Sequence, residues 1–336
     1  MSELNFDFQA YIRERKGLDA ANARTGAAYA YPGDQKVLRA LGHVTPVTLA
    51  VEATVRLWKR MTQSEILGTA VKVSERQFPE LHDITVQCAE RLHIPLPDVY
   101  VVPNVGALNA STFGTNDDSF IALNGVLVDH LSDEELRFVI GHECGHIQNN
   151  HVVYMTALYY LTYSANLFLR WIVTPAVMAL QSWTRRAEIT CDRAGLICSG
   201  DLKSGSSALA RLALGSNRLA DQLNMEEYLH QLEESQEDAG RLMELFHSHP
   251  YLPKRVAALR LFARTHYFHK VTGQEPAEGH GRSLSWCDSQ VKQLISVFGD
   301  KGGEVAAEED AGESPAPESD QGEGSDDTSR EEGNNA

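Results

Sequence analysis

The sequence has few cysteines, no basic patch and no leader of signal-peptide type, and each absence excludes a class of protein. Its five cysteines are an odd set without the spacing of a disulfide framework, which favours a reducing compartment. No cluster of Lys and Arg predicts nucleic-acid binding. Residues 1–17 have no apolar core and include three basic side chains, so we expect no cleavable signal peptide. We therefore expect a cytoplasmic protein without a nucleic-acid partner.

The negative charge is concentrated at one end of the chain. Residues 300–336 contain 13 acidic and two basic side chains, so they carry −11 of the net charge of −16. This stretch has almost no aliphatic side chain larger than Ala, which predicts disorder. It is either a solubilising tail or a tail that binds a partner. We divide the chain into an N-terminal extension (1–35), a main domain (36–299) that can bury a sizeable core, and this acidic tail.

The most informative segment is His142–His146, which reads H-E-x-x-H. Side chains four residues apart share one face of a helix, so His142 and His146 can bind one metal ion with Glu143 beside it. A capping box at Ser132–Glu135, followed by an apolar run, predicts a strong and mostly buried helix here. The pattern predicts a zinc-dependent peptidase. The alternative is a set of ordinary polar residues on a helix face.

A second pattern, E-x-x-x-D at Glu188 and Asp192, offers a third ligand. Catalytic zinc needs three protein ligands and one open position. Glu188 can complete a His, His, Glu set, and Asp192 can accept the free ring N–H of a ligand histidine. The alternative is a solvated acidic face, because three arginines lie nearby. Cys144 and Cys191, inside the two patterns, are expected to be small buried residues, with a redox or inhibitory role as the alternative.

Together these patterns resemble the HtpX-like and CAAX-prenyl-protease-like gluzincin metallopeptidases. The similarity extends over residues 65–265, and its blocks follow the order of that family. One departure is the stretch 107–115, which is poorer in Gly than in many relatives. The blocks are Gln77–Leu81, Ile94–Val101, Asn109-Ala110, Phe120–Leu127, His142–His146, Glu188–Asp192, and Ser248–Pro250 with Arg255.

The resemblance implies an α+β, mostly helical fold. Its zincin-like metallopeptidase core would place a small sheet beside the H-E-x-x-H helix, with a helical C-terminal part. It further implies a zinc metalloendopeptidase that hydrolyses protein or peptide substrates with one Zn²⁺ per chain. The zinc ligands would be His142, His146 and Glu188, and Glu143 would be the general base that takes a proton from zinc-activated water.

Other site residues also follow from the resemblance. Asn109, with Ala110, would hold the substrate backbone, and His249 would stabilise the oxyanion. The alternatives for His249 are a plain helix-start residue, or Tyr251 as the donor in its place. Arg255 is expected to form a structural ion pair with a buried carboxylate such as Asp192, the alternative being a place on a helix surface.

Apolar periodicity predicts short strands in the first half of the chain and helices elsewhere. No internal repeat is evident. The predicted strands are 66–73, 99–102 and 119–123, and the predicted helices are 36–60, 74–92, 132–168, 176–199, 204–219, 225–246 and 252–269.

The apolar character of residues 152–183 raises the question of whether this segment crosses a membrane. His146 and Glu188 must meet at one ion, so the chain between them must cross a membrane an even number of times. Two crossings need about 40 apolar residues and a turn. Only 31 residues, 152–182, are available, and Arg170 lies among them. We expect a soluble helical hairpin bent near Pro175, with a re-entrant or membrane-surface hairpin, rich in Tyr and Trp, as the alternative.

Two alternatives to an active peptidase follow from the same residues. The first is a zinc-stabilised module that binds peptides without cutting them. Glu143 counts against it, because such a module has no need of a general base. The second is a latent enzyme whose groove is filled by the first 35 residues or by the acidic tail.

Overall fold

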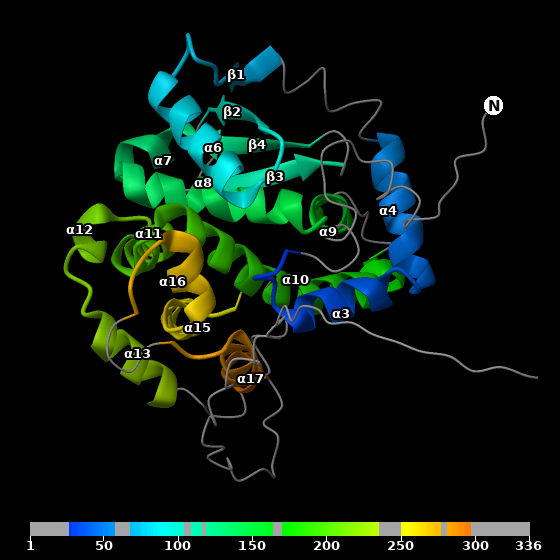
Figure 1. The fold of residues 1–336 in the computed structure, drawn as a ribbon. Helices are drawn as coiled ribbons and strands as arrows, with labels where there is room; N and C mark the ends of the chain where they lie inside the picture. The colour runs from blue at the N-terminus through cyan, green and yellow to red at the C-terminus, as the bar shows by residue number, and fades with distance from the viewer. Residues whose placement is uncertain are drawn as a thin grey trace, which may run out of the picture. The chain divides into compact units, whose positions relative to one another are not determined.

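A four-stranded sheet lies on the helix that carries the H-E-x-x-H motif in the computed structural model (Figure 1). The structure describes residues 27–57, 68–103, 109–115, 119–163, 170–234, 250–276 and 281–296. Within these residues, helices predominate and the strands form one small sheet, which confirms the predicted α+β, mostly helical class. The predicted tail, 300–336, and His249 lie outside the described residues.

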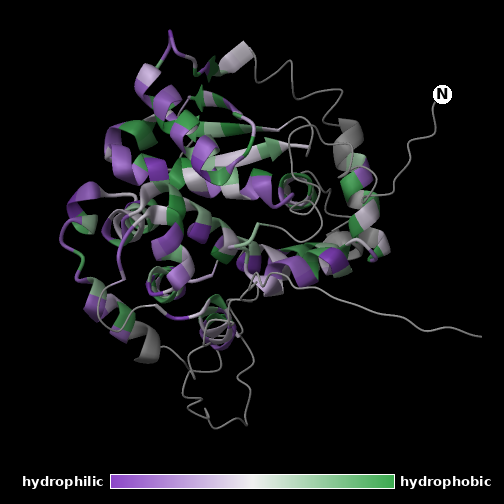
Figure 2. Cartoon of the chain, viewed as in Figure 1, coloured by the Kyte–Doolittle hydropathy of each residue, from purple (hydrophilic) through white to green (hydrophobic). Residues whose placement is uncertain are grey.

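The sheet has the order β1-β2-β4-β3, so β3 (Ala110–Gly114) is an edge strand. The parallel pair β2 (Asp98–Val102) and β4 (Ser119–Asn124) occupies the middle, and β1 (Val71–Lys72) and β3 pair antiparallel with them. Side chains alternate between the two faces of β4. Ile121 and Leu123 join the main core with the motif helix, whereas neighbouring side chains pack against the other face. In Figure 2 the two central strands are mainly hydrophobic.

Two long helices carry the two sequence patterns. Helix α8 (Asp133–Gln148) begins at the predicted capping box, with both hydrogen bonds of Ser132 and Glu135 present. Helix α10 (Arg170–Ser199) runs against it. Their close approach depends on glycine, because a Cβ atom at Gly145 would lie 2.8 Å from the Cβ of Ala194. This contact brings the H-E-x-x-H and E-x-x-x-D faces together.

Several helices end earlier than predicted. The predicted helix 36–60 is two helices, α3 (Pro32–Leu41) and α4 (Thr45–Leu57), because Pro46 lacks an N–H and fits only the first turn of α4. The predicted helix 132–168 is also divided. Helix α8 ends before Asn150, which has a left-handed φ of 61°, and α9 (Val152–Tyr163) follows.

The remaining differences concern element ends and two missed helices. Within the described part of the strand predicted at 66–73, only β1 is a strand, and residues 68–69 are helical. Helix α6 (Pro79–Leu92) begins later than the predicted helix 74–92, because Pro79 is favoured in the first turn of a helix. Helix α7 (Gly125–His130), which follows β4 directly, and α17 (Leu284–Ile295) were not predicted. The other helices are α11 (Leu202–Leu214), α12 (Asn217–Ala220), α13 (Met225–Glu234), α15 (Leu252–Ala263) and α16 (His266–Thr272).

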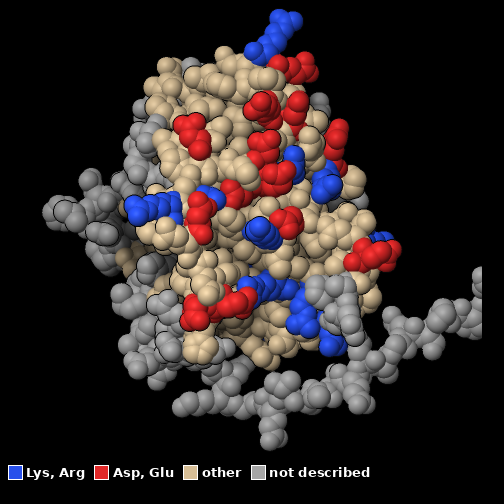
Figure 3. Space-filling view, turned by 90° about the vertical axis from the view of Figure 1, so that its left-hand side faces the viewer, with Lys and Arg blue, Asp and Glu red and all other residues tan. Residues whose placement is uncertain are grey.

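The C-terminal helices are joined to the core by ion pairs. Arg211 of α11 contacts Glu135 of α8 at 2.9 Å and Asp221 at 2.6 Å. Arg260 of α15 contacts Glu226 of α13 at 2.6 Å. On the face shown in Figure 3, acidic and basic side chains are interspersed rather than gathered by sign. Such a surface suits these local pairs, each of which contributes little on its own.

Helices α9 and α10 pack against each other, as predicted for the hairpin at 152–183, and α10 continues through Pro175. Among the residues that the structure describes, none of the helices combines the length and the apolar character that a membrane crossing needs.

The segment before α3 is part of the core. Tyr29 and Tyr31 are buried, the backbone N–H of Ala27 donates to Asn149, and Arg193 donates to the carbonyl of Tyr29. Residues 27–35 of the predicted N-terminal extension therefore pack on the helices of the main domain, while the domain boundaries remain a prediction.

Candidate metal centre

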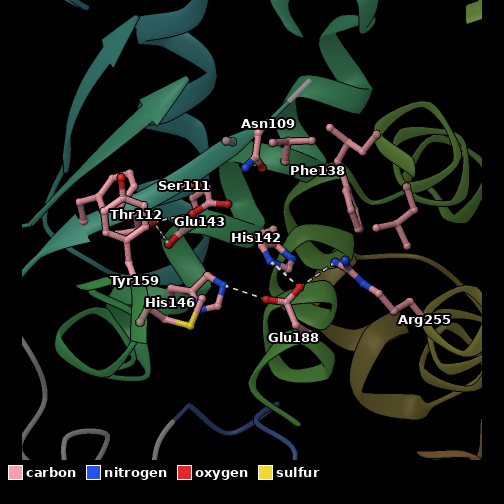
Figure 4. A pocket seen from close by; sticks show the side chains of 16 residues that line it. Asn109, Ser111, Thr112, Phe138, His142, Glu143, His146, Tyr159, Glu188 and Arg255 are labelled. Atoms are coloured by element: carbon pink, nitrogen blue, oxygen red, sulfur yellow. Dashed lines mark hydrogen bonds and ion pairs between the residues drawn. The ribbon is translucent and has the colours of Figure 1, made fainter. Parts of the chain in front are cut away.

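The predicted ligands converge at the facing surfaces of α8 and α10 (Figure 4). The Nε2 atom of His142 lies 3.6 Å from one carboxylate oxygen of Glu188. The Nε2 atom of His146 lies 3.6 Å from the other oxygen. All three side chains are buried. The i, i+4 spacing on α8 and the packing of α10 thus place two imidazoles around one carboxylate.

These distances suit a metal ion. Zinc–nitrogen and zinc–oxygen bonds of about 2.0–2.2 Å in a tetrahedral site put neighbouring donor atoms about 3.4 Å apart. The observed 3.6 Å separations are close to this value and too long for good hydrogen bonds. The local field also favours a cation. Burial alone would lower the pKa of His146, but the carboxylates of Glu188 and Glu143 raise it.

Asp192 supports His142 from behind, in the position predicted for it. Its Oδ1 atom lies 3.0 Å from Nδ1 of His142. Burial opposes ionisation of Asp192, yet Arg255 and His142 hold the pKa of this carboxyl below its usual value. An ionised Asp192 only accepts, so Nδ1 of His142 carries the proton and its Nε2 lone pair faces Glu188.

Arg255 of α15 clamps the two carboxylates of α10. Its guanidinium donates to both oxygens of Asp192 at 2.9 and 2.6 Å and lies 3.2 Å from Glu188. The predicted ion pair is therefore present. Although burial would lower the pKa of Arg255, Asp192 and Glu188 raise it, so this side chain stays charged.

Glu143 projects into the same pocket and meets a residue that sequence analysis missed. The hydroxyl of Thr112, on edge strand β3, donates to Oε2 of Glu143 at 2.6 Å. Both side chains are buried. Only the position of Thr112 two residues after Ala110, which belongs to the pair expected to hold the substrate backbone, hinted at a role, since no motif includes it.

The pocket lies between β3 and the motif helix. Asn109 and Ala110 line it, and Asn109 accepts a backbone hydrogen bond from Asn124. Figure 4 places Phe138 and Tyr159 on opposite sides of the histidines. Further apolar side chains extend these two walls, namely Val139, Leu209 and Leu212 with Phe138, and Phe113 and Met155 with Tyr159. We refer to this pocket, with its two apolar walls and the polar side chains between them, as the groove.

Edge strand β3 offers backbone groups to this groove. The N–H of Gly114 points away from β4, because it donates to the Thr156 hydroxyl at 3.2 Å. Backbone groups of successive strand residues alternate in direction, so Thr112 and Ala110 point the same way as Gly114. Two residues of the edge are thus positioned to pair with an added strand, and Thr156 closes the far end.

A buried histidine lies behind His146, and the sequence gave no sign of its role. The Nδ1 atoms of His146 and His151 are 3.2 Å apart. On its other side, His151 places Nε2 3.0 Å from Asp34 of α3. Asp34 and His151 have no exposed surface. Asp34 lies in the predicted N-terminal extension, 108 residues from the motif, so no local spacing could connect it to the site.

Cys191 is a second possible ligand. Its sulfur lies within 4.8 Å of ring nitrogens of His142 and His146, so a His, His, Cys set is geometrically available. However, Cys191 is not among the residues that line the pocket, whereas Glu188 is. Burial, with Glu188 and Asp34 nearby, raises the pKa of the Cys191 thiol well above its usual value, which disfavours the thiolate that zinc binds. Cys144 and Cys191 are both fully buried, as predicted.

The predicted oxyanion donor His249 lies outside the described residues. The alternative donor, Tyr251, is described and stands at the N-terminal cap of α15, four residues before Arg255.

Comparisons with known proteins match one family model and several relatives. The model of peptidase family M48 matches residues 75–263. A plastoglobule-localized metallopeptidase 48 of Arabidopsis thaliana is 38% identical over 174 residues, which cover 50% of this chain and 49% of that protein. A protease HtpX homolog of Thermodesulfovibrio yellowstonii is 27% identical over 58% of this chain and 79% of that protein.

A protease HtpX homolog 2 of Methanosarcina mazei is 26% identical over 56% of this chain and 74% of its own length. The chain thus spans about half of the Arabidopsis relative and about three quarters of the other two. No solved structure matches the chain.

Proposed function

Because the chain belongs to peptidase family M48, we propose that it is a zinc-dependent metalloendopeptidase that cleaves protein substrates. The observation that carries this proposal is the convergence of His142, His146 and Glu188, at 3.6 Å separations, beside Glu143. Zinc is the ion that best fits two imidazoles and one carboxylate with an open position. His142, His146 and Glu188 would hold it, with Asp192 orienting His142.

A bound zinc ion supplies a Lewis acid and an acidified water for attack on the scissile carbonyl. Glu143 then accepts the proton of this water on its carboxylate and passes it to the leaving amine. The Thr112 hydroxyl holds one carboxylate oxygen of Glu143 in place, which leaves the other oxygen for the proton. His249 is the proposed donor to the oxyanion, with Tyr251 as the alternative.

The substrate would bind as an extra strand on the free edge of β3. The backbone groups of Ala110 and Thr112 would pair with it, and Asn109 would hold its backbone at the open end. This mode suits extended or unfolded polypeptides, because a folded strand is already paired. The two apolar walls of the groove would accept hydrophobic side chains on either side of the scissile bond.

We further propose that the enzyme is cytoplasmic and contacts a lipid surface through residues 152–183. Exposed apolar side chains on neighbouring helices favour it, since Leu49, Tyr159 and Met178 are 56%, 47% and 43% exposed. One relative is, by its name, localised to plastoglobules. Co-sedimentation of the protein with liposomes, lost in a Tyr159→Ser, Met178→Ser variant, would support this contact, and equal pelleting with and without liposomes would contradict it.

The test of function compares wild type with Glu143→Gln and with Glu134→Gln. Glu134 is an exposed carboxylate on the same helix and serves as the matched control. We expect about one zinc per chain in all three, and casein cleavage by wild type and Glu134→Gln only.

The other outcomes are equally informative. Zinc in all three without any cleavage would favour the latent enzyme or the non-catalytic peptide-binding module. Absence of zinc in all three would contradict the metal site itself.

A further inference from the structure

The His151–Asp34 pair occupies the space behind His146 and takes no part in the chemistry described so far. His151 is the residue that precedes α9, and its ring stacks edge-on against Trp183 at 5.3 Å. Its Nδ1 lies 3.2 Å from Nδ1 of His146 and 3.6 Å from the sulfur of Cys191, and its Nε2 lies 3.0 Å from a carboxylate oxygen of Asp34 without hydrogen-bond alignment. For a fully buried imidazole between a histidine and a carboxylate, the protonation pattern is set by these neighbours.

The contact between His146 and His151 requires one N–H and one lone pair. If Nε2 of His146 faces a metal ion, its Nδ1 must carry the proton and donate. Nδ1 of His151 must then accept, so the proton of His151 lies on Nε2, facing Asp34. The opposite tautomer of His151 would put two N–H groups against each other, or leave His146 with its Nε2 protonated and unable to bind metal.

Asp34 is held as an acceptor. The indole N–H of Trp183 donates to its Oδ1 at 2.8 Å, and the hydroxyl of Thr190 donates to its Oδ2 at 2.7 Å. Burial opposes ionisation, but His151 and these donors keep the pKa of Asp34 below its usual value. The segment that carries Asp34 is itself fixed, since the N–H of Tyr31 donates to Thr190.

We propose that Asp34, acting through His151, selects the metal-binding tautomer and the ring orientation of His146. Asp34 and His151 are positioning residues, and residues 27–35 are a working part of the metal centre rather than an appendage. The inference rests on the proposed function, because it assumes that His146 binds zinc. Asp192 fixes the tautomer and orientation of His142 by direct contact, whereas Asp34 does the same for His146 through one additional imidazole.

Asp34→Asn is the decisive variant, because the donor-only indole of Trp183 fixes the orientation of the new amide. The amide oxygen must face Trp183, so the NH₂ group faces His151. Nε2 of His151 must then accept, its proton moves to Nδ1, and it opposes the N–H of His146. We expect zinc affinity to fall about 10- to 100-fold, the usual effect of losing such a partner.

Zinc affinity is measured by competition with a chelator, and ligand geometry by the visible absorption of the cobalt-substituted protein. Asp192→Asn is the positive control and should weaken zinc binding. Tyr29→Phe is the matched control in the same segment. It loses the hydroxyl that donates to Gln148 and accepts from Asn149, without touching the relay, so its affinity and cobalt spectrum should equal those of wild type.

His151→Phe keeps an aromatic ring, although a larger one, and removes the acceptor, so it tests the same relay if Asp34→Asn folds poorly. The double variant should bind zinc no more weakly than His151→Phe alone, because Asp34 acts only through His151. Additive losses in the double variant would overturn the relay, as would an Asp34→Asn affinity equal to that of Tyr29→Phe. Failure of wild type to bind zinc would instead overturn the proposed function, so the two failures are distinguishable.

Discussion

The two proposed ligand histidines of α8 lie one turn apart, yet the protein supports them in different ways. Behind His142 lies a charged clamp, in which Asp192 contacts the ring directly and Arg255 binds the carboxylate. Behind His146 lies a relay in which a buried imidazole stands between the ring and Asp34. The residues of the clamp come from α10 and α15, and those of the relay come from α3 and the turn before α9. A metal centre can thus use a strong ion pair on one side and a neutral hydrogen-bonding group on the other.

The difference has an energetic reason. The clamp contains two carboxylates and one guanidinium in a buried place, so each charge depends on the others. The relay contains one carboxylate with two hydrogen-bond donors, Trp183 and Thr190, and the neighbouring ring of His151, which compensate a single charge. The clamp should therefore be the more costly of the two to break.

Glu188 contacts both His142 and His146, so its loss should abolish the metal site whichever way each histidine is supported. Glu188→Gln keeps the side-chain shape but removes the negative charge shared by His142 and His146. We expect zinc content near zero and casein cleavage reduced by about 10³-fold or more. Metal analysis and a cleavage assay measure both. Full zinc content with normal cleavage would show that Glu188 is not a ligand.

The clamp is broken by Arg255→Gln, which leaves Asp192 and Glu188 uncompensated. Removing one partner of a buried ion pair costs about 3–5 kcal/mol of unfolding free energy. The cost should be largest in the metal-free protein, because zinc replaces part of the missing positive charge. Denaturant unfolding with and without zinc measures it. Arg260→Gln is the surface control and should lose no more than about 1 kcal/mol, as exposed pairs do.

Thr112→Val tests whether the support of Glu143 is separate from the supports of His142 and His146. The substitution removes the hydroxyl that donates to Glu143 and keeps the shape of the side chain. We expect kcat to fall about 10- to 100-fold, with KM and zinc affinity nearly unchanged, since a hydrogen bond to a charged group is worth about 1.5–3 kcal/mol. Thr112→Ser should restore the rate. A change in zinc affinity would show that this contact also supports the metal ligands.

Acid should weaken the metal-free protein through both carboxylates. The pKa values of Asp192 and Asp34 are lowered on folding. Their stabilisation is therefore complete above the unfolded pKa of about 3.9 and is lost as pH falls through the lower folded values. Unfolding free energy measured between pH 6 and pH 2 should show this loss. Asp192→Asn and Asp34→Asn should each flatten the curve, and an unchanged slope in either would contradict its lowered pKa.

Sequence alone predicted the parts of the site that are local. The i, i+4 spacing in His142–His146 and Glu188–Asp192, and the capping box of α8, each depend on a few neighbouring residues. Asp34, His151 and Thr112 were missed, because each reaches the site by tertiary packing and none belongs to a spaced pattern. The divided helices show the same limit, since the break at Asn150 depends on one left-handed residue. That break is what turns His151 towards His146.

The ligand set is the central claim, and X-ray absorption at the zinc edge of the wild-type protein tests it most directly. We expect only nitrogen and oxygen neighbours, at about 2.0–2.2 Å, from His142, His146 and Glu188. A sulfur neighbour at about 2.3 Å would contradict it and would assign Cys191 as the third ligand.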